Sequence, residues 1–152
     1  MTYLKKGDRA PDFSGVDQDG NLISLNDFKG KKLALYFYPK DDTPGCTAQA
    51  CNLRDHFSEL ENKGVYIIGV SADPEVKHRK FIDKYKLPFP LLADTDKKIC
   101  KAYGVWGEKK FMGKTFEGIH RITFLIENNT IIDVIDKVDT KNHTEQILSI
   151  IK

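Results

Sequence analysis

The sequence predicts a mixed α/β domain whose central sheet is covered by helices on both faces. Near-continuous apolar runs at 33–38 and 65–70 are typical of strands buried on both faces. Segments with helical spacing of apolar residues follow them, so these strands are expected to pair in parallel. Two later strands, at 121–126 and 130–135, are joined by a short polar turn and are expected to form an antiparallel hairpin.

The first half of the chain is expected to begin with a polar loop and an N-terminal β-hairpin extension. Asp19-Gly20 is a common turn pair in the middle of residues 13–25. After the strand at 33–38, a long helix is expected from Pro44 to about Lys63, because apolar residues recur there at intervals of three and four. Gly64 is expected to close this helix.

The second half continues the alternation of strands and helices. After the strand at 65–70, the expected elements are a helix at 75–85, a short extended piece at 89–92, a short helix at 96–103 and a terminal helix at 142–151. Residues 104–118 are rich in glycine and are expected to be irregular. No internal repeat or linker is evident, so residues 1–152 are expected to form a single domain.

Composition argues against several classes of protein. The 152 residues carry a net charge of +2 with acids and bases mixed, which argues against a dedicated nucleic-acid or membrane surface. No stretch is long and apolar enough to span a bilayer, and the N-terminus lacks the apolar core of a signal peptide. Three cysteines are an odd number, which argues against a pure disulfide framework. Without an export signal we expect a reducing cytoplasm, where cysteines are more often catalytic, redox-active or buried than structurally bridged.

The stretch YFYPKDDTPGCTAQACNLR, residues 36–54, predicts a reactive thiol at the start of a helix. Thr43 is a favoured N-cap residue, Pro44 suits the first helical position, and Cys46 is then the third residue of the helix. The N-terminus of a helix carries partial positive charge and unpaired N–H groups, which favour a thiolate. Gly45 lets a ligand approach the backbone. A functional role for Cys46 is therefore favoured over that of a small buried residue.

A thiolate at Cys46 also needs a cation, because the helix end contributes only about 0.3–1 kcal/mol at an exposed site. Arg121 is the candidate, since it opens a late strand and strand ends converge on helix starts in such folds. Arg54 is poorly placed, about 12 Å along the same helix by rise alone. Thr43 keeps two compatible roles: a plain N-cap, or a hydroxyl that hydrogen bonds to the thiolate or to a substrate oxygen.

A second cysteine, Cys51, lies five residues after Cys46, so the pair does not form the Cys-x-x-Cys motif of a thioredoxin-type site. In an intact helix the two Cα atoms are about 8.6 Å apart, from the helical rise and radius. A disulfide spans at most about 7 Å between Cα atoms. Either these cysteines never bond, or the first helical turns unwind during function.

The remaining candidate residues favour structural roles. Cys100, within a short helix, is expected to be a packed thiol. The four histidines show no ligand spacing with the cysteines, so no metal site is expected. Basic and aromatic residues lie together in Lys109-Lys110-Phe111 and again at 114–116, as in some nucleic-acid sites, but a solvated loop face is favoured.

The pattern Pro39-x-x-x-Thr43-x-x-Cys46 resembles the active-site motif of peroxiredoxins. The flanking YFYPKDDTPGCTAQAC is similar to their Q group, also called the bacterioferritin comigratory protein group. GDRAPDF, GVSAD, VWGEK and GIHRITFLI extend the resemblance over nearly the whole chain. It implies a thioredoxin-like fold with an N-terminal extension. It also implies an antioxidant enzyme that reduces hydrogen peroxide and alkyl hydroperoxides without a metal or bound cofactor.

The resemblance also implies roles for individual residues. Cys46 matches the peroxidatic cysteine, Thr43 a residue that shapes its pocket, and Arg121 the arginine that completes it. Cys51 matches the resolving cysteine, so the resemblance implies a Cys46–Cys51 disulfide that thioredoxin reduces, in a protein that is often a monomer. The substrate pocket is expected to include Pro39, Pro44 and Gly45.

The residues themselves and the resemblance together predict a cycle of peroxide reduction at Cys46, unwinding of the helix start, and disulfide formation with Cys51. Two other classes of protein stay open. One is a dithiol carrier or disulfide exchanger that uses the same two cysteines. The other is a non-catalytic redox sensor or metal-binding module.

Overall fold

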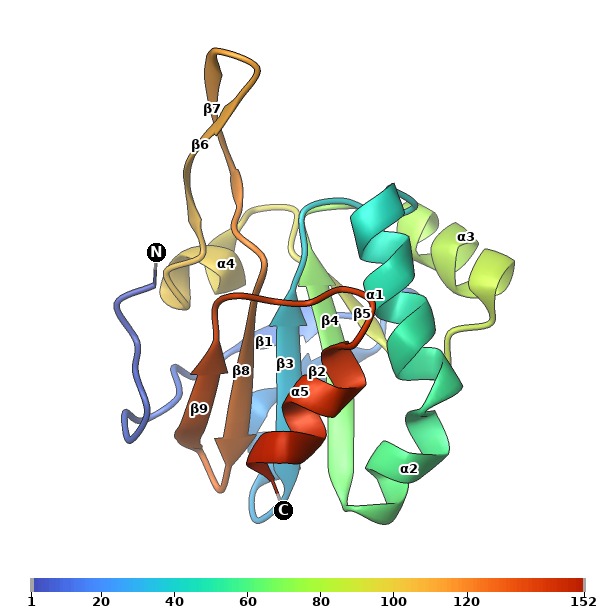
Figure 1. Cartoon of the computed structure of the whole chain (residues 1–152), viewed down its shortest axis with the longest axis vertical. Coiled ribbons are helices and arrows are strands. Elements are labelled where there is room, and N and C mark those ends of the chain that lie inside the picture. Colours follow the sequence, from blue (N-terminus) through green and yellow to red (C-terminus); the bar gives the residue numbers. More distant parts are fainter. Residues whose placement is uncertain (1, 152) are drawn as a thin grey trace.

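The computed structural model describes residues 2–151, and its centre is a five-stranded mixed sheet with the order β5-β4-β3-β8-β9 (Figure 1). β3 (Lys32–Phe37), β4 (Val65–Ser71) and β5 (Leu91–Ala93) run parallel to one another. β8 (Ile122–Glu127) pairs antiparallel with β3, and β9 (Thr130–Ile135) pairs antiparallel with β8. The predicted mixed sheet is confirmed.

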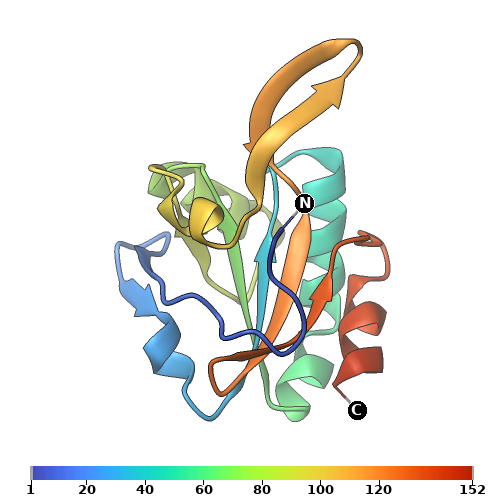
Figure 2. The same ribbon diagram turned by 90° about the vertical axis from the view of Figure 1, so that its left-hand side faces the viewer.

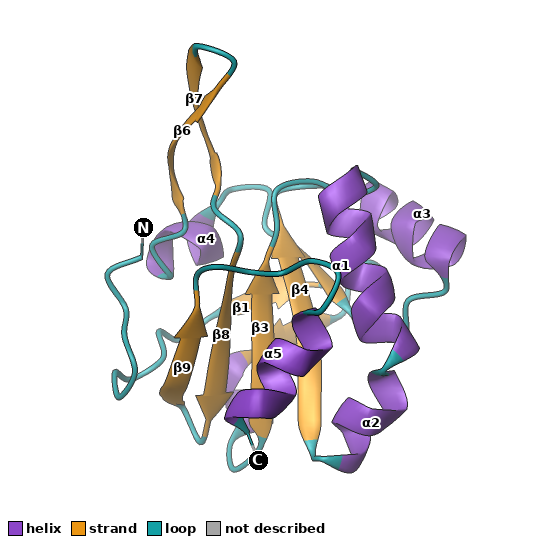
Figure 3. Ribbon diagram, in the orientation of Figure 1, coloured by secondary structure: helices purple, strands orange, loops and turns teal. Residues whose placement is uncertain are grey.

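Two hydrophobic cores lie on opposite faces of this sheet, and Figure 3 shows the helices that flank the sheet. One core receives buried residues from four helices: α1 (Pro44–Asp55), α2 (Phe57–Asn62), α3 (Glu75–Tyr85) and α5 (His143–Ile150). The other lies under the short helix α4 (Lys98–Ala102), the 3-10 helix η1 (Leu25–Phe28) and the predicted N-terminal hairpin of β1 (Ser14–Val16) and β2 (Leu22–Ser24). No helix in the described part of the chain is long and apolar enough to cross a membrane.

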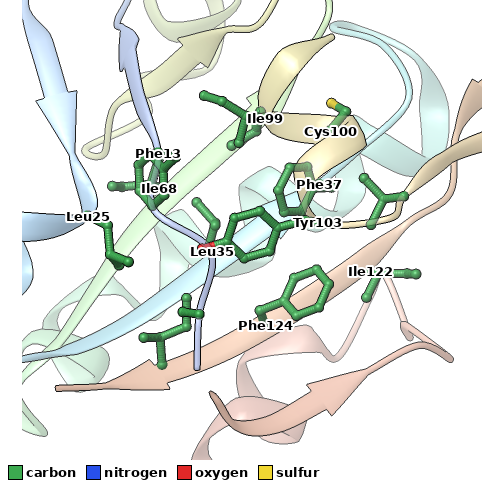
Figure 4. Close-up of a cluster of buried hydrophobic side chains, with 14 of the residues drawn as sticks. Phe13, Leu25, Leu35, Phe37, Ile68, Ile99, Cys100, Tyr103, Ile122 and Phe124 are labelled. Carbon is green, nitrogen blue, oxygen red and sulfur yellow. The ribbon is translucent and has the colours of Figure 1, made fainter. Parts of the chain in front are cut away.

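Strand β3 contributes to both cores because successive side chains of a strand point to opposite faces. Leu33, Leu35 and Phe37 belong to one core, and Ala34 and Tyr36 to the other, together with Tyr38, the residue after the strand. In the first core, the rings of Phe37, Tyr103 and Phe124 meet with centroids between 5.0 and 5.7 Å apart (Figure 4). Burial on both faces explains the continuous apolar run of this strand.

The expected single helix from Pro44 to Lys63 is wrong, because the chain breaks at His56 into α1 and α2. The backbone of His56 has φ −113° and ψ 18°, outside helical geometry. Its ring Nδ1 lies 2.9 Å from the carbonyl oxygen of Asn52, which also receives the His56 N–H at 3.3 Å. A side chain that competes for a helical carbonyl distorts the helix at that point.

The segment at 104–118, expected to be irregular, contains a β-hairpin of β6 (Trp106–Phe111) and β7 (Lys114–Ile119). Met112 and Gly113 form its turn, with φ of 51° and 78°. The hairpin projects away from the body of the molecule, at the end where β3 leads into α1 (Figures 1 and 2). Most of its side chains are exposed, so its strands lack the alternation of apolar and polar residues that marks a half-buried strand.

Candidate active site

The register of the central sheet brings together the two predicted halves of the site. Phe37, the last residue of β3, pairs with Ile122, the first residue of β8. Arg121 immediately precedes β8, so it lies beside the point where the chain leaves β3 and turns into α1. Its Nη2 donates a hydrogen bond to Cys46 Sγ over 3.4 Å. The structure thus places the predicted cation against the predicted thiol.

Cys46 is the third residue of α1, and its side chain is almost fully buried against the sheet. The first N–H groups of a helix have no partner within the helix and point toward its N-terminal end. Those dipoles and the half-buried Arg121 guanidinium both favour negative charge on the sulfur. Because burial lowers the local dielectric constant, this attraction is stronger than the same contact in water.

Gln49 is a site residue that the sequence reasoning missed. Its Oε1 accepts a hydrogen bond of 2.8 Å from Arg121 Nη1, so one guanidinium contacts both Gln49 and Cys46. The Gln49 side chain is fully buried, and its Nε2 has no hydrogen-bond partner among the described residues. Gln49 lies three residues after Cys46, hence on the same face of α1, and this spacing is the signal that could have found it.

Gly45 allows the close approach of Arg121, since a Cβ atom at this position would lie 3.1 Å from Arg121 Nη2. A Gly45→Ala substitution is therefore expected to displace the guanidinium and to lower kcat/KM about tenfold for the peroxide reduction that the sequence predicts. Stability should not fall, because alanine is favoured over glycine in a helix. Steady-state kinetics and Tm check this, with Thr47→Ala as the control. Unchanged kinetics in Gly45→Ala would contradict the tight contact.

Thr43 is the N-cap of α1, as predicted, with extended backbone at φ −102° and ψ 157°. Its hydroxyl makes no bond to the first turn of the helix, so the expected capping hydrogen bond is absent. Instead the hydroxyl donates to the Lys40 carbonyl oxygen over 2.8 Å. The Thr43 side chain therefore stabilises the turn before the helix. Pro44 occupies the first helical position as predicted, and the half-buried Pro39 follows β3 and the buried Tyr38.

A buried hydrogen-bond network around Asp41 supports the turn that precedes α1. Asp41 accepts a 2.5 Å hydrogen bond from Tyr38 Oη, and its other carboxylate oxygen lies 2.6 Å from His78 Nδ1. His78 Nε2 lies 2.9 Å from the Leu92 carbonyl oxygen, and the Asp41 N–H donates to Asp73. The Asp41 carboxylate is thus directed at His78 and Tyr38, in a fully hydrogen-bonded arrangement.

Cys51 is half-buried on α1 and, like the other two cysteines, is not in a disulfide. Burial raises the pKa of its thiol above the ordinary value. The next residue, Asn52, fastens α1 to the start of α5. Asn52 Nδ2 donates to the Lys141 carbonyl oxygen over 2.8 Å, and the Thr144 N–H donates to Asn52 Oδ1 over 2.8 Å. Cys51 therefore lies at the boundary between the start of α1 and its anchored part.

Two further groups near Cys46 were not expected from the sequence. The buried Tyr36 hydroxyl has no hydrogen-bond partner among the described residues, and burial, with the Cys46 charge second, raises its pKa. Lys109, expected on a solvated loop face, is half-buried, and its Nζ donates to the Ile119 carbonyl oxygen over 2.9 Å. Burial lowers the pKa of Lys109, and the charge of Arg121 lowers it further.

The other candidates lie away from this site. Cys100 is fully buried, its N–H donates to Asp94 over 2.8 Å, and burial raises the pKa of its thiol, consistent with a packed residue. Arg54 donates to the Tyr85 carbonyl oxygen over 2.7 Å and contacts Asp55. Between residues 2 and 151, no cluster of His, Cys, Asp or Glu side chains is arranged to hold a metal ion.

Comparison with known proteins identifies close relatives of this chain. The model of the AhpC/TSA family matches residues 6–135. Peroxiredoxin Bcp of Escherichia coli is 50% identical over 153 residues, which cover 100% of this chain and 98% of that protein.

Solved structures agree with this result. A cysteine-to-serine mutant of Xylella fastidiosa PrxQ has a TM-score of 0.91 at 30% identity, over 98% of this chain and 96% of that one. The bacterioferritin comigratory protein of Xanthomonas campestris, solved in a study of its alkyl peroxide reduction activity, has a TM-score of 0.85 at 33% identity, over 91% and 89%. With the mixed sheet and N-terminal hairpin, these likenesses confirm the predicted thioredoxin-like fold.

Proposed function

Since this chain belongs to the AhpC/TSA family and is a thiol peroxidase of its Bcp and Q group, we propose that Cys46 is the peroxidatic cysteine. The observation that carries this proposal is the 3.4 Å contact of Cys46 Sγ with Arg121 Nη2 at the start of α1. The substrates are hydrogen peroxide and alkyl hydroperoxides, and the latter class is supported by the activity named for the Xanthomonas relative.

In the first step, the Cys46 thiolate attacks the terminal oxygen of the hydroperoxide. The O–O bond breaks, the sulfur is oxidised by two electrons to a sulfenic acid, and the alkoxide or hydroxide that leaves takes up a proton to become an alcohol or water. Arg121 and the first amides of α1 stabilise the negative charge that moves from sulfur to the leaving oxygen. Pro39, Thr43, Pro44 and Gly45 border the pocket.

In the second step, Cys51 resolves the sulfenic acid. Its thiol condenses with the Cys46 sulfenic acid to give a disulfide and one water molecule. Because a regular helix keeps these Cα atoms about 8.6 Å apart, the turns of α1 before Asn52 must unwind first. Unwinding also exposes Cys51, which reverses the burial that raises its pKa and so favours the reactive thiolate.

A thioredoxin-like dithiol reductant then returns both cysteines to thiols, as is general in this family. We propose thioredoxin itself as this reductant, acting on a monomeric, single-domain enzyme in the cytoplasm. An odd number of cysteines and the need for an external dithiol fit a reducing compartment. No resident metal or bound cofactor is required for these steps.

A Cys51→Ser variant is expected to complete one turnover with hydrogen peroxide and then stall when thioredoxin is the only reductant. The Cys46 sulfenic acid forms normally, but no thiol remains at position 51 to resolve it. Mass spectrometry after one equivalent of peroxide should find a Cys46–Cys51 disulfide in the native chain and a Cys46 sulfenic acid in the variant. Full thioredoxin-driven turnover by Cys51→Ser would show that Cys100 or an external thiol resolves Cys46 instead.

A further inference from the structure

The β6–β7 hairpin exposes large apolar side chains next to the active site. Phe111 is 67% exposed, Met112 at the turn is 86% exposed, and Phe116 is 48% exposed. The hairpin stands out from the body at the end where α1 begins (Figures 1 and 2). Exposed apolar side chains gathered on one element mark interaction surfaces, whereas single ones are ordinary.

The pairing of the two strands places both phenylalanines on one face. Lys109 pairs with Phe116, and Phe111 pairs with Lys114, so these four side chains share a face of the hairpin. The stem of Lys109 and the ring of Phe116 both fold over Gly118, where an added Cβ atom would lie 3.2 Å from Lys109 and 3.5 Å from Phe116. We call Lys109, Phe111, Lys114 and Phe116 the hairpin face.

The hairpin face begins at the active site. Lys109 Nζ donates a hydrogen bond of 2.9 Å to the carbonyl oxygen of Ile119, two residues before Arg121. Burial lowers the pKa of Lys109, the charge of Arg121 lowers it further, and the charge of Cys46 raises it. Phe111 lies two residues farther along β6, about 7 Å by strand geometry. The face thus extends outward from the site, with lysine stems beside aromatic rings.

We propose that the hairpin face is the docking surface for the protein dithiol that reduces the Cys46–Cys51 disulfide. This inference rests on the proposed function, because it needs that disulfide to form. The reductant must bring its own sulfur into contact with one of the two cysteines. An interface of ordinary size covers about 800 Å² on each partner, so a protein in that position also covers the neighbouring hairpin. Phenylalanine and methionine are enriched in the buried centre of such interfaces.

A protein partner fits the hairpin better than an anionic lipid surface does. Its three lysines, at positions 109, 110 and 114, are offset by Glu108 and Glu117, which pair with each other on the opposite face. Segments that bind anionic membranes carry larger clusters of positive charge. Aromatic rings flanked by a few charged groups are instead typical of a protein interface, with an apolar centre and a polar rim.

The test is a Phe111→Ser/Phe116→Ser double variant of the full chain, with Leu22→Ser as the matched control. Leu22 is 71% exposed on β2, in the N-terminal hairpin. The double variant is expected to lower kcat/KM for thioredoxin at least about tenfold. The rate of Cys46 oxidation by peroxide, turnover with dithiothreitol and Tm should stay unchanged. The control should match the native chain in every assay.

The assays separate failure of this inference from failure of the proposed function. Unchanged kcat/KM for thioredoxin in the double variant would overturn the docking surface and leave the peroxidase cycle intact. Absence of a Cys46–Cys51 disulfide in the native chain would overturn both. Loss of binding to phosphatidylglycerol vesicles, or loss of a dimer in sedimentation, with unchanged thioredoxin kinetics would assign the face to a membrane or to a second copy. If the double variant is unstable, Met112→Asp at the exposed turn replaces it in the same thioredoxin assay, with the same expected result.

Discussion

A Cys46→Ser protein is expected to lose hydroperoxide reduction to the background level, a fall of at least about a thousandfold in turnover. A serine hydroxyl is not ionised near neutral pH, and its oxygen cannot be oxidised to a sulfenic acid. The Arg121 guanidinium, 3.4 Å from the sulfur in the native chain, would then have no anion to stabilise. Peroxide consumption with thioredoxin as the reductant measures this loss.

The matched control is Cys100→Ser, which changes a buried cysteine that lies in α4 and belongs to the opposite core. Turnover should persist in this variant, although a hydroxyl in an apolar core should lower Tm. Retention of thioredoxin-driven turnover by Cys46→Ser would contradict the assignment of the peroxidatic cysteine. Loss of turnover only in Cys100→Ser would move the reacting thiol to α4.

An Arg121→Ala protein is expected to react with peroxide about 10²- to 10³-fold more slowly, the usual result of removing one donor that stabilises transition-state charge. The substitution removes the cation beside Cys46 and leaves the buried Gln49 without its guanidinium partner. Arg121→Lys should recover only part of the rate, because one ammonium group cannot reproduce the two-pronged contact. Single-turnover oxidation of Cys46 by peroxide gives these rates directly.

Arg54→Ala is the control for net charge. Arg54 contacts Tyr85 and Asp55 away from the first turn of α1, so the reaction of Cys46 with peroxide should be unchanged. An equal loss in Arg54→Ala and Arg121→Ala would mean that overall charge, and not the local hydrogen bond, controls the reaction.

The central sheet could be predicted from the sequence because its strands are buried on both faces. β3 and β4 are continuous apolar runs in the sequence, and each is followed by a helix. Strands that alternate with helices usually pair in parallel, so this arrangement could be predicted. α3 begins and ends at the expected residues, Glu75 and Tyr85. These elements rely on periodicity over many residues, the signal that single sequences carry best.

Two elements were not predictable because a local feature overrides periodicity. The apolar stripe continues from α1 into α2, so it gives no sign of the break at His56. At that break the ring nitrogen of His56 contacts a helical carbonyl oxygen. The β6–β7 hairpin has little core contact to impose a pattern, and Met112 is an unusual residue for a turn position with positive φ. Only the following Gly113 is typical of such a turn.

The active site could be predicted only in part, because some of its residues carry a local sequence signal and others depend on contacts between distant segments. Cys46 carries a local signal, since Thr43, Pro44 and Gly45 mark a helix start. Arg121 required the register of β3 and β8, which periodicity suggests but does not establish. Asp41 supports the turn before α1 through its contact with the buried His78, thirty-seven residues away in sequence, and no local pattern predicts that contact.

In the proposed catalytic cycle, we expect Asn52 to limit how much of α1 unwinds. Its side chain ties α1 to Lys141 and Thr144, so the segment that has to open ends at Cys51, after about two turns of helix. At the other end, Asp41 is hydrogen bonded to its buried partners Tyr38 and His78. The oxidised cysteines are therefore expected to lie on a short unwound segment whose two ends are held by hydrogen bonds. We therefore expect most of the core to stay buried, and so protected from proteases, until the disulfide is reduced.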